Sequence, residues 1–364
     1  MLQFVQYGLA WSAALFVALA LIKALAPLAR HVRLVDVPNE RKHHRDDIPL
    51  IGGSAVYITS TALLLALCII VEEILHLPIP ALLPGFAAGG LLVFVGLLDD
   101  LHELSIRWRV IMTAVAALIF TFGTGFNQIE LGDLFGQGAV SLQGWQATAF
   151  MTICIFGMVN AFDMLDGLDG ILGLNLIGSV VLFYTLMGRT PPFELMVVMG
   201  ALSGYLWSNL SLTRHVPKVF LGDSGSMLLG FVVAVFLLAA ATTHFGNSQQ
   251  IPPVTALYMV GLPLIDMVTV TLRRMFTGGS PFEPGRDHFH HLVLDMVSDA
   301  VPADTKPRIA IFVVTVMGMV YPAIGTLMLK NAVATPVQFR IIVGLGIVHL
   351  AITSIYWFRH PKLS

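Results

Sequence analysis

Long apolar stretches alternate with short polar connections along most of the 364-residue chain. Each stretch is about 20 residues long, the length that an α-helix needs to cross the hydrocarbon core of a bilayer. The approximate bounds of these stretches are 5–29, 51–71, 81–98, 108–125, 144–162, 170–187, 193–210, 225–243, 254–272, 307–329 and 337–357. The pattern predicts an all-α polytopic membrane protein with about eleven transmembrane helices.

Basic residues are distributed unevenly between alternate connections. One predicted face of the membrane domain holds Arg30, Arg33, Arg41, Lys42, Arg45, Arg107, Arg109, Arg214, Lys218, Arg273, Arg274, Arg286, Lys306, Arg308, Arg359 and Lys362. The opposite face holds only Arg189, Lys330 and Arg340. The positive-inside rule makes the first face cytoplasmic, so the N-terminus is expected in the periplasm and the C-terminus in the cytoplasm.

The connection between residues 123 and 144 differs from the others. Two short runs, Ile129 to Asp133 and Ala139 to Leu142, flank a glycine-rich turn at Gly136 and Gly138. Such runs around a turn predict a small β-hairpin, which the topology places in the periplasm.

Composition agrees with the hydrophobic pattern. The chain is 56% hydrophobic and 12% charged, whereas a soluble domain has roughly 25% charged residues. No repeat of about 20–50 residues and no low-complexity linker divides the sequence, so residues 1–364 are expected to form one membrane domain. No nucleic-acid partner is expected, and a homodimer is left open.

A cluster of carboxylates marks the end of the fifth apolar stretch. Asp163, Asp166 and Asp169 follow one another at three-residue spacing in the segment that begins at Asn160. An acidic residue at the edge of a bilayer costs a few kcal/mol unless it is paired, hydrated or bound to a cation. On a continuous helix this spacing keeps the carboxylates on one broad face, where they can converge. A hydrated, polar helix end is the alternative.

The same cluster has the donor chemistry of a magnesium site. Hard carboxylate oxygens suit Mg²⁺, which shares protein carboxylates with substrate phosphates, and no Cys/His spacing argues for zinc. Gly167 and Gly170 would let the backbone turn or approach a ligand closely.

Other polar residues gather on the same predicted face. Asp99 and Asp100 end the third stretch, Asp223 precedes the eighth, and a histidine-rich segment lies in the largest cytoplasmic loop. This shared sidedness predicts one cytoplasmic pocket. Two anions at a helix C-terminus face the negative end of its dipole, so Asp99 and Asp100 call for a bound cation or a cationic neighbour, unless they form only a solvated helix end.

The segment from Phe220 to Gly225 leads into the eighth stretch through Gly222. Asp223 or Ser224 could simply cap the helix, or the glycine-rich approach could leave backbone N–H groups for a phosphate. Both interpretations stay open.

The histidine-rich loop combines Arg286 with His288, His290 and His291. These side chains suit hydrogen bonds to phosphate oxygens, although three histidines could also bind a metal. Arg45 lies in a basic run that is either an orientation signal or a second anion site.

Asp266 lies inside the ninth stretch. An intramembrane acid is a functional candidate, with pairing to a neighbouring helix as the structural alternative.

These motifs together resemble the polyprenyl-phosphate N-acetylhexosamine-1-phosphate transferases. That superfamily has an Asp-Asp pair, an Asn-Ala-x-Asn-x-x-Asp-Gly-x-Asp-Gly motif, a Phe-x-Gly-Asp-x-Gly motif and a histidine-rich loop, in the order found here. The His-x-His-His form of the loop is similar to that of bacterial UDP-N-acetylglucosamine:undecaprenyl-phosphate transferases. One departure is Asp163, which stands where the superfamily usually has Asn.

The resemblance implies a phosphoglycosyltransferase of the bacterial inner membrane that joins a UDP-N-acetylhexosamine, first of all UDP-GlcNAc, to undecaprenyl phosphate. It also implies an early step of O-antigen or related glycan synthesis. The implied cofactor is Mg²⁺, with Mn²⁺ as a substitute, held by Asp223 and Asp163. The implied catalytic residues are Asp99, Asp100, Asp166 and Asp169, and the implied substrate-binding residues are Phe220, Arg286, His288, His290, His291, Arg45 and Asn160.

Two functions of other classes compete with this interpretation. Membrane carboxylates also serve ion-coupled transporters, which tend to place them near the midplane within inverted repeats. An intramembrane aspartyl protease would use a Gly-Asp motif such as Gly222-Asp223, but it leaves the other carboxylates without a role.

Overall fold

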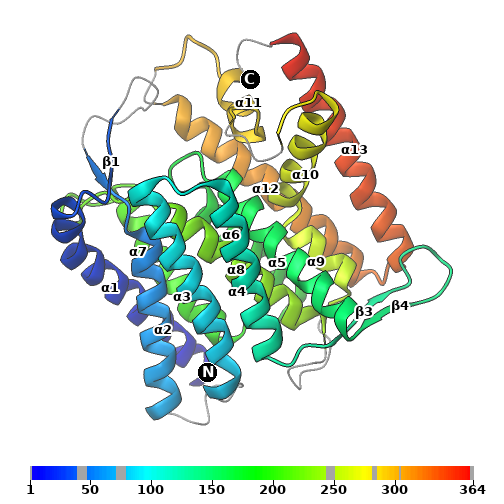
Figure 1. Ribbon diagram of the computed structural model, residues 1–364, viewed down its shortest axis with the longest axis horizontal. Coiled ribbons are helices and arrows are strands. Elements are labelled where there is room, and N and C mark those ends of the chain that lie inside the picture. Colours follow the sequence, from blue (N-terminus) through cyan, green and yellow to red (C-terminus); the bar gives the residue numbers. More distant parts are fainter. Residues whose placement is uncertain are drawn as a thin grey trace. The chain divides into compact units, whose positions relative to one another are not determined.

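The computed structural model describes residues 2–38, 47–70, 79–242, 251–280, 285–302 and 305–360. Over these residues it contains thirteen α-helices and two small antiparallel sheets of two strands each (Figure 1). The chain divides into two compact units. Unit 1 comprises Met1–Phe126, Met151–Val159 and Pro191–Val233, and unit 2 comprises Asn127–Phe150, Asn160–Thr190 and Ala234–Ser364. Organisation as one functional domain remains a prediction, and each unit is described by itself.

Unit 1 is a helical bundle with one short sheet. Its complete elements are α1 (Leu2–His31), β1 (Val35–Asp36), β2 (Ile48–Pro49), α2 (Gly52–Ile70), α3 (Ile79–His102), α4 (Ile106–Gly123) and α7 (Phe193–Asn209). It also contains the middle of α5 (Trp145–Leu165) and the first part of α8 (Asp223–Ala241). Helices α3 and α4 lie side by side (Figure 1), and α7 packs against both α1 and α2.

Small residues let α1 and α7 approach each other closely. A Cβ atom on Gly204 would come within 2.6 Å of the backbone oxygen of Leu15 and 2.9 Å of the Cβ of Ala18. Gly200 makes the same kind of approach one turn earlier, against Ala14. Because apolar contacts alone give no preference for protein over lipid, close backbone packing of this kind stabilises helix pairs in membranes.

Unit 2 contains the remaining helices and the second sheet. Its complete elements are β3 (Gln128–Gly132), β4 (Val140–Gln143), α6 (Ile171–Met187), α9 (Pro253–Met259), α10 (Gly261–Phe276), α11 (Phe289–Met296), α12 (Lys306–Lys330) and α13 (Thr335–Arg359). Helix α12 packs against α6, α9, α10 and α11, and α13 packs against α9, α10 and α11. Glycines again mark close contacts: a Cβ on Gly261 would lie 2.5 Å from the ring of Tyr321.

The predicted hairpin between residues 123 and 144 is confirmed. Strands β3 and β4 pair antiparallel, with Ile129 opposite Leu142 and an irregularity between Glu130 and Gly132. Asp133 Oδ1 stabilises the turn by accepting hydrogen bonds from the backbone N–H groups of Gly136 at 2.6 Å and Gln137 at 3.0 Å. The periplasmic location of the hairpin remains a prediction.

Each predicted apolar stretch coincides with a helix or a pair of helices. By length and composition, eight of the described helices are able to cross a membrane, or nine if a bent pair counts as one span. The two remaining stretches are α6 and α7, each of 17 residues, and of these two only α6 is a shorter apolar helix. The chain is therefore a multi-pass membrane protein, and the predicted number of about eleven crossings is open.

The ninth predicted stretch was expected to be one helix. The structure instead divides it into two helices, so this expectation was wrong. Helix α9 ends at Met259, α10 begins at Gly261, and the two are bent by 86°. Val260 stands at the break with φ −121° and ψ 24°. Hydropathy cannot detect such a bend, because both arms are apolar. The bend directs α10, with Asp266, along a different axis from α9.

Candidate functional site

Asp99 lies at the C-terminal end of α3, where it holds the turn into α4. Its Oδ1 accepts a hydrogen bond from the backbone N–H of Leu104 at 2.7 Å, and its Oδ2 lies 3.0 Å from Nε of Arg109. The side chain is buried, with 6% exposure. The cationic neighbour that an anion at a helix C-terminus requires is therefore Arg109, from the first turns of α4.

Asp100 crosses from α3 to the first residue of α8. Its Oδ1 accepts a hydrogen bond from the backbone N–H of Asp223 at 3.0 Å. A carboxylate at a helix N-terminus is stabilised by the helix dipole. Another helix thus supplies an acceptor at the N-terminus of α8, and capping by Asp223 or Ser224 themselves remains a prediction. Because Asp100 occupies this N-terminus, the phosphate alternative for the same amide is disfavoured.

Two glycines allow this contact between α3 and α8. Gly96, one turn before Asp100, packs directly on the backbone of Ser224 with no room for a Cβ atom. Gly222 has a left-handed backbone, with φ +72°, and a Cβ there would lie 2.6 Å from Oδ2 of Asp100. Glycine is therefore required at position 222 for two reasons: the left-handed backbone, and the space that the Asp100 carboxylate occupies.

Phe220 is held through its backbone next to β2. Its N–H donates to the carbonyl of Pro49 at 2.9 Å, and its carbonyl accepts from the N–H of Gly52 at 2.9 Å. The Nζ of Lys218 lies 5.2 Å from the centre of the Phe220 ring, a cation–π distance. One face of the Phe220 ring is thus covered by the ammonium group of Lys218, two residues earlier in the chain. Arg45 lies outside the described residues.

The carboxylate motif does not continue as one helix. Helix α5 ends at Leu165, and α6 begins at Ile171 after Gly170, which has a left-handed backbone with φ +71°. Asn160 and Asp163 lie in the last turns of α5, whereas Asp166 and Asp169 lie in the loop. The expectation of one helical face carrying Asp163, Asp166 and Asp169 was therefore wrong, because it assumed helical periodicity past residue 165. All these side chains are half-buried.

The structure brings the carboxylate loop together with the histidine-rich loop in unit 2. The Nε2 atom of His290 lies against the α-carbon of Gly167, so close that a Cβ atom would collide with it. His290 comes from α11 and is 1% exposed. Among the described residues neither of its ring nitrogens has a hydrogen-bond partner. A buried imidazole facing a loop of carboxylates is suited to contact a polar ligand there.

The histidine rings form a compact row at the start of α11. The rings of His288 and His290 are nearly parallel, with centroids 5.9 Å apart, and the centroids of His290 and His291 are 4.1 Å apart. Burial, together with the neighbouring charges, lowers the pKa of His290 well below its usual value. Burial and the charge of Arg286 lower the pKa of His291 to about 4. Both imidazoles are thus neutral near pH 7, and the positive charge of the loop resides on exposed Arg286.

Asp287 fixes the histidine-rich loop to the C-terminal end of α10. Its carboxylate pairs with Arg274, whose Nε also donates to Oδ2 at 3.2 Å. Arg273 donates to Oδ2 at 2.8 Å and to the Asp287 carbonyl at 2.7 Å. Burial raises the pKa of Asp287, but the hydrogen bonds and charges of Arg274 and Arg273 outweigh it and lower the pKa to about 2. From the sequence alone, the two arginines are only orientation signals, and Asp287 has no separate role.

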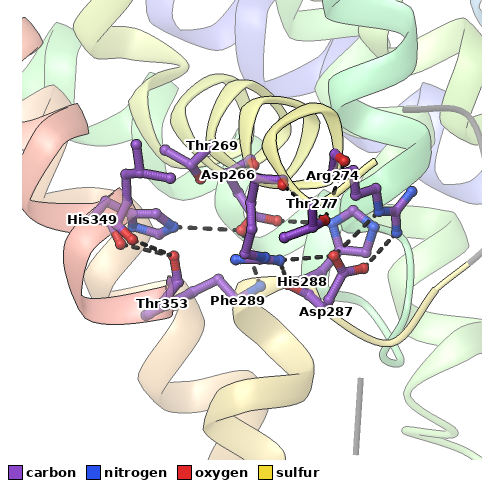
Figure 2. A network of polar contacts seen from close by, with 11 residues as sticks. Asp266, Thr269, Arg274, Thr277, Asp287, His288, Phe289, His349 and Thr353 are labelled. Carbon is purple, nitrogen blue, oxygen red and sulfur yellow. Dashed lines mark hydrogen bonds and ion pairs between the residues drawn. The ribbon is translucent and has the colours of Figure 1, made fainter. Parts of the chain in front are cut away.

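Asp266 contacts the first histidine of the same loop (Figure 2). Nδ1 of His288 lies 3.1 Å from Oδ2 of Asp266, and the N–H of Phe289 donates to Oδ1 at 3.0 Å. His349 of α13 approaches the same carboxylate, with Nε2 3.4 Å from Oδ1. Asp266 is thus paired with residues of neighbouring elements, which is the structural alternative for this intramembrane acid. His349 is not among the residues predicted from the sequence, although a lone histidine inside an apolar stretch is itself a signal.

No three His, Cys, Asp or Glu side chains among the described residues are arranged to hold a metal ion. The carboxylates that the sequence assigns to Mg²⁺ have suitable oxygen chemistry, but Asp223 lies in unit 1 and Asp163 in unit 2. The assignment of these two carboxylates to Mg²⁺ remains a prediction.

The chain is similar to known bacterial membrane enzymes. Residues 82–241 match the family model described as glycosyl transferase family 4. A protein of Escherichia coli (strain K12), named undecaprenyl-phosphate alpha-N-acetylglucosaminyl 1-phosphate transferase, is 35% identical over 310 residues, 82% of this chain and 78% of the relative. Proteins with the same name are 34% identical in Haemophilus influenzae, over 83% of this chain and 81% of the relative, and in Yersinia pestis, over 76% and 74%. The chain therefore belongs to glycosyl transferase family 4, within the superfamily of membrane phosphoglycosyltransferases that its motifs resemble.

Proposed function

We propose that this protein transfers N-acetylglucosamine 1-phosphate from UDP-GlcNAc to undecaprenyl phosphate, releasing UMP. The observation that carries the proposal is the contact between Gly167 and His290, which joins the carboxylate loop to the histidine-rich loop. A site for a sugar diphosphate and a metal ion needs carboxylates and phosphate-binding groups side by side. The names of the relatives supply the sugar and the lipid.

The reaction is a single exchange of phosphorus–oxygen bonds. An oxygen of the lipid phosphate attacks the sugar-linked phosphorus of UDP-GlcNAc, the bond from that phosphorus to the bridging oxygen breaks, and UMP leaves with the electron pair. No water takes part. A phosphate monoester is largely ionised near neutral pH, since its second pKa is about 6, so the protein needs to align the phosphates and neutralise charge more than to remove a proton. A covalent aspartyl-phosphate intermediate is the alternative route.

The residues of the chain divide these tasks. Asp223 and Asp163 would hold Mg²⁺, with Mn²⁺ as a substitute, and the ion when bound would neutralise charge on the diphosphate. In unit 2, Asp166 and Asp169 complete the nucleotide pocket with Asn160. The remaining proposed phosphate contacts are Arg286, His288, His290, His291 and Arg45.

In unit 1, the Asp223 N–H donates a hydrogen bond to Asp100, which supports a positioning role for Asp100 toward Asp223. Asp99 and its partner Arg109 are proposed to orient the lipid phosphate. Phe220 is proposed to stack on the uracil base through the ring face away from Lys218.

We further propose that about eleven helices cross the bacterial inner membrane, with the N-terminus in the periplasm and the active site and C-terminus on the cytoplasmic side. On this topology UDP-GlcNAc enters from the cytoplasm and the lipid from the membrane. The product would feed O-antigen or a related surface glycan.

The test is release of UMP by the purified protein with undecaprenyl phosphate, Mg²⁺ and a panel of UDP-sugars. We expect UDP-GlcNAc to be the best donor, EDTA to stop the reaction and Asp223→Ala to abolish it. Asp299→Asn is the matched control, because Asp299 is an exposed carboxylate paired only with Lys306 among the described residues. UMP release in the presence of EDTA contradicts the metal assignment, and preference for another UDP-N-acetylhexosamine corrects the sugar.

The transporter alternative is separated by a second assay. Proton flux in liposomes without UMP release from any UDP-N-acetylhexosamine would replace the proposed function by ion transport.

A further inference from the structure

Asp266 holds two adjacent residues of the histidine-rich loop at once. Its Oδ2 lies 3.1 Å from the imidazole Nδ1 of His288, and its Oδ1 accepts the backbone N–H of Phe289 at 3.0 Å. Asp266 is 2% exposed and His288 is 6% exposed. Both the ring and the backbone at the start of α11 are therefore fixed to one buried carboxylate of α10 (Figure 2).

The carboxylate is itself supported from a third helix. Nε2 of His349 lies 3.4 Å from Oδ1 of Asp266, and the ring of His349 packs against Phe289 with centroids 5.2 Å apart. His349 is 8% exposed. Helices α10, α11 and α13 thus meet at Asp266, where both carboxylate oxygens have partners.

This arrangement determines which nitrogen of His288 is available. A carboxylate can only accept hydrogen bonds, so Nδ1 of His288 carries a proton and points to Asp266. Nε2 is then the ring atom left to contact a ligand. Buried carboxylates that orient histidines in this way support many metal and catalytic sites. His290 differs, because its ring nitrogens have no hydrogen-bond partner among the described residues.

We propose that Asp266 is the positioning residue for His288, holding Nδ1 so that Nε2 faces the phosphates of the substrate, and that His349 holds Asp266 in place. This inference rests on the proposed function, since it assigns a geometry to one of its phosphate-binding groups. The competing explanation is a purely structural tie between α10 and α11.

The first test replaces the carboxylate with an amide of the same shape. In Asp266→Asn the amide oxygen still accepts the Phe289 N–H, but the amide nitrogen then faces Nδ1 of His288 and favours the opposite tautomer. We expect the variant to fold and its kcat/KM for UDP-GlcNAc to fall by at least about 100-fold, within the range known for an Asp-to-Asn change behind a catalytic histidine. Asp299→Asn, the same change at an exposed site of unit 2, should stay within about twofold, the scatter of a surface substitution.

The second test separates docking from function at His288. The side-chain amide of His288→Asn occupies the place of Nδ1 and still donates to Asp266, but nothing replaces Nε2. We expect this variant to keep the wild-type melting temperature in detergent and to lose activity. A structural tie predicts the reverse, with activity retained because the contact to Asp266 is retained.

A double-mutant cycle provides the third test. If Asp266 acts through His288, adding Asp266→Asn to His288→Asn should lower kcat/KM by no more than about threefold beyond His288→Asn alone. Independent roles would instead multiply the two losses. The cycle remains informative if Asp266→Asn lowers stability, because activity is compared at a temperature where all variants are folded.

The outcomes distinguish this inference from the function on which it rests. If wild-type protein releases no UMP from any UDP-N-acetylhexosamine, the proposed function fails. If the wild type is active but Asp266→Asn keeps its activity, or His288→Asn stays active, only the positioning role of Asp266 is overturned.

Discussion

Nε2 of His290 lies against the α-carbon of Gly167, with no space between them for a side chain. Gly167 does not have a left-handed backbone, so the requirement for glycine at this position is steric and not conformational. The contact joins two motifs that lie far apart in the sequence. It is the point at which the carboxylate loop and the histidine-rich loop meet in unit 2.

We predict that Gly167→Ala damages activity more than stability. The added methyl group must displace the His290 ring, which is 1% exposed and therefore has little room to move. Overpacking of this kind costs about 1–3 kcal/mol of folding free energy. A displacement of about 1 Å at a site that aligns phosphates can lower kcat/KM about 100-fold. UMP release and thermal unfolding in detergent measure the two effects.

The control for this change is Gly344→Ala in α13. Nothing lies within 4 Å of a Cβ at Gly344, so alanine should be neutral or stabilise the helix by up to about 1 kcal/mol. If Gly167→Ala retains full activity, His290 does not need its present position for the reaction.

A second prediction concerns Gly222, which faces Asp100 at the start of α8. Alanine there meets two costs: the left-handed backbone at φ +72°, about 1–2 kcal/mol, and the approach of Cβ to Asp100 Oδ2 at 2.6 Å, about 1–3 kcal/mol. Gly125→Ala isolates the first cost, because Gly125 lies in the same unit with φ +68° and nothing within 4 Å of its Cβ. We expect Gly222→Ala to lower the melting temperature more than Gly125→Ala does. If the two variants lower the melting temperature equally, the Asp100 side chain moves aside without a measurable cost.

The sequence was sufficient to predict the long apolar helices and the hairpin of β3 and β4, because apolar length and turn residues are local signals. It did not predict the short helix α11 or the sheet of β1 and β2. It could not predict the bend at Val260, since both arms of the pair are apolar, nor the end of α5 at Leu165. The three-residue spacing of the carboxylates looked helical, and only tertiary packing decides that Asp166 and Asp169 lie in a loop.

For the site, the sequence supplied the candidate residues but not their partners. The pairs Asp99 with Arg109, Asp100 with Asp223 and Asp266 with His288 join different elements. A polar residue inside an apolar segment can be recognised from the sequence by itself, but its partner on another element cannot. His349 was missed because a single histidine in a long apolar helix has no neighbouring motif to draw attention to it.

A third prediction concerns the pH dependence of stability. His291 has a pKa of about 4 in the folded protein and about 6.5 when unfolded, so between these values the unfolded chain binds the extra proton. Its contribution is complete above about pH 6.5 and is lost as the pH falls toward 4, reaching a loss of roughly 2 kcal/mol at pH 5. His290 acts in the same direction. The melting temperature in detergent should thus fall between pH 7.5 and 5, and the fall should be smaller in His291→Asn.

Asp287 titrates in a separate window. Its folded pKa of about 2 lies below the ordinary value of 3.8, so its contribution is complete above about pH 3.8 and is lost only below that. Asp287→Asn should therefore leave the change between pH 7.5 and 5 unaltered. Disappearance of this change in Asp287→Asn would contradict its assignment to the histidines.

A fourth prediction tests the double arginine contact itself. Arg274→Lys keeps the positive charge but cannot reach both carboxylate oxygens of Asp287 as the guanidinium does, so the loop should open more often. We expect faster proteolysis between α10 and α11 and a lower melting temperature. Arg189→Lys, at an exposed position of the same unit, should change neither. Unaltered proteolysis in Arg274→Lys would mean that Arg273 alone holds the loop.

The last prediction concerns Asp163, where the superfamily motif usually has Asn. Asp163→Asn replaces an anionic ligand by a neutral amide oxygen, which binds a hard cation more weakly but occupies the same space. The proposed magnesium role therefore predicts that the variant stays active at saturating Mg²⁺, while the Mg²⁺ concentration for half-maximal activity rises about tenfold, equivalent to about 1.4 kcal/mol of binding free energy. Mg²⁺ titration of UMP release measures this, with Asp299→Asn as the control. An unaltered Mg²⁺ requirement would remove Asp163 from the metal site, and complete loss of activity at saturating Mg²⁺ would mean that its negative charge is needed for the transfer itself.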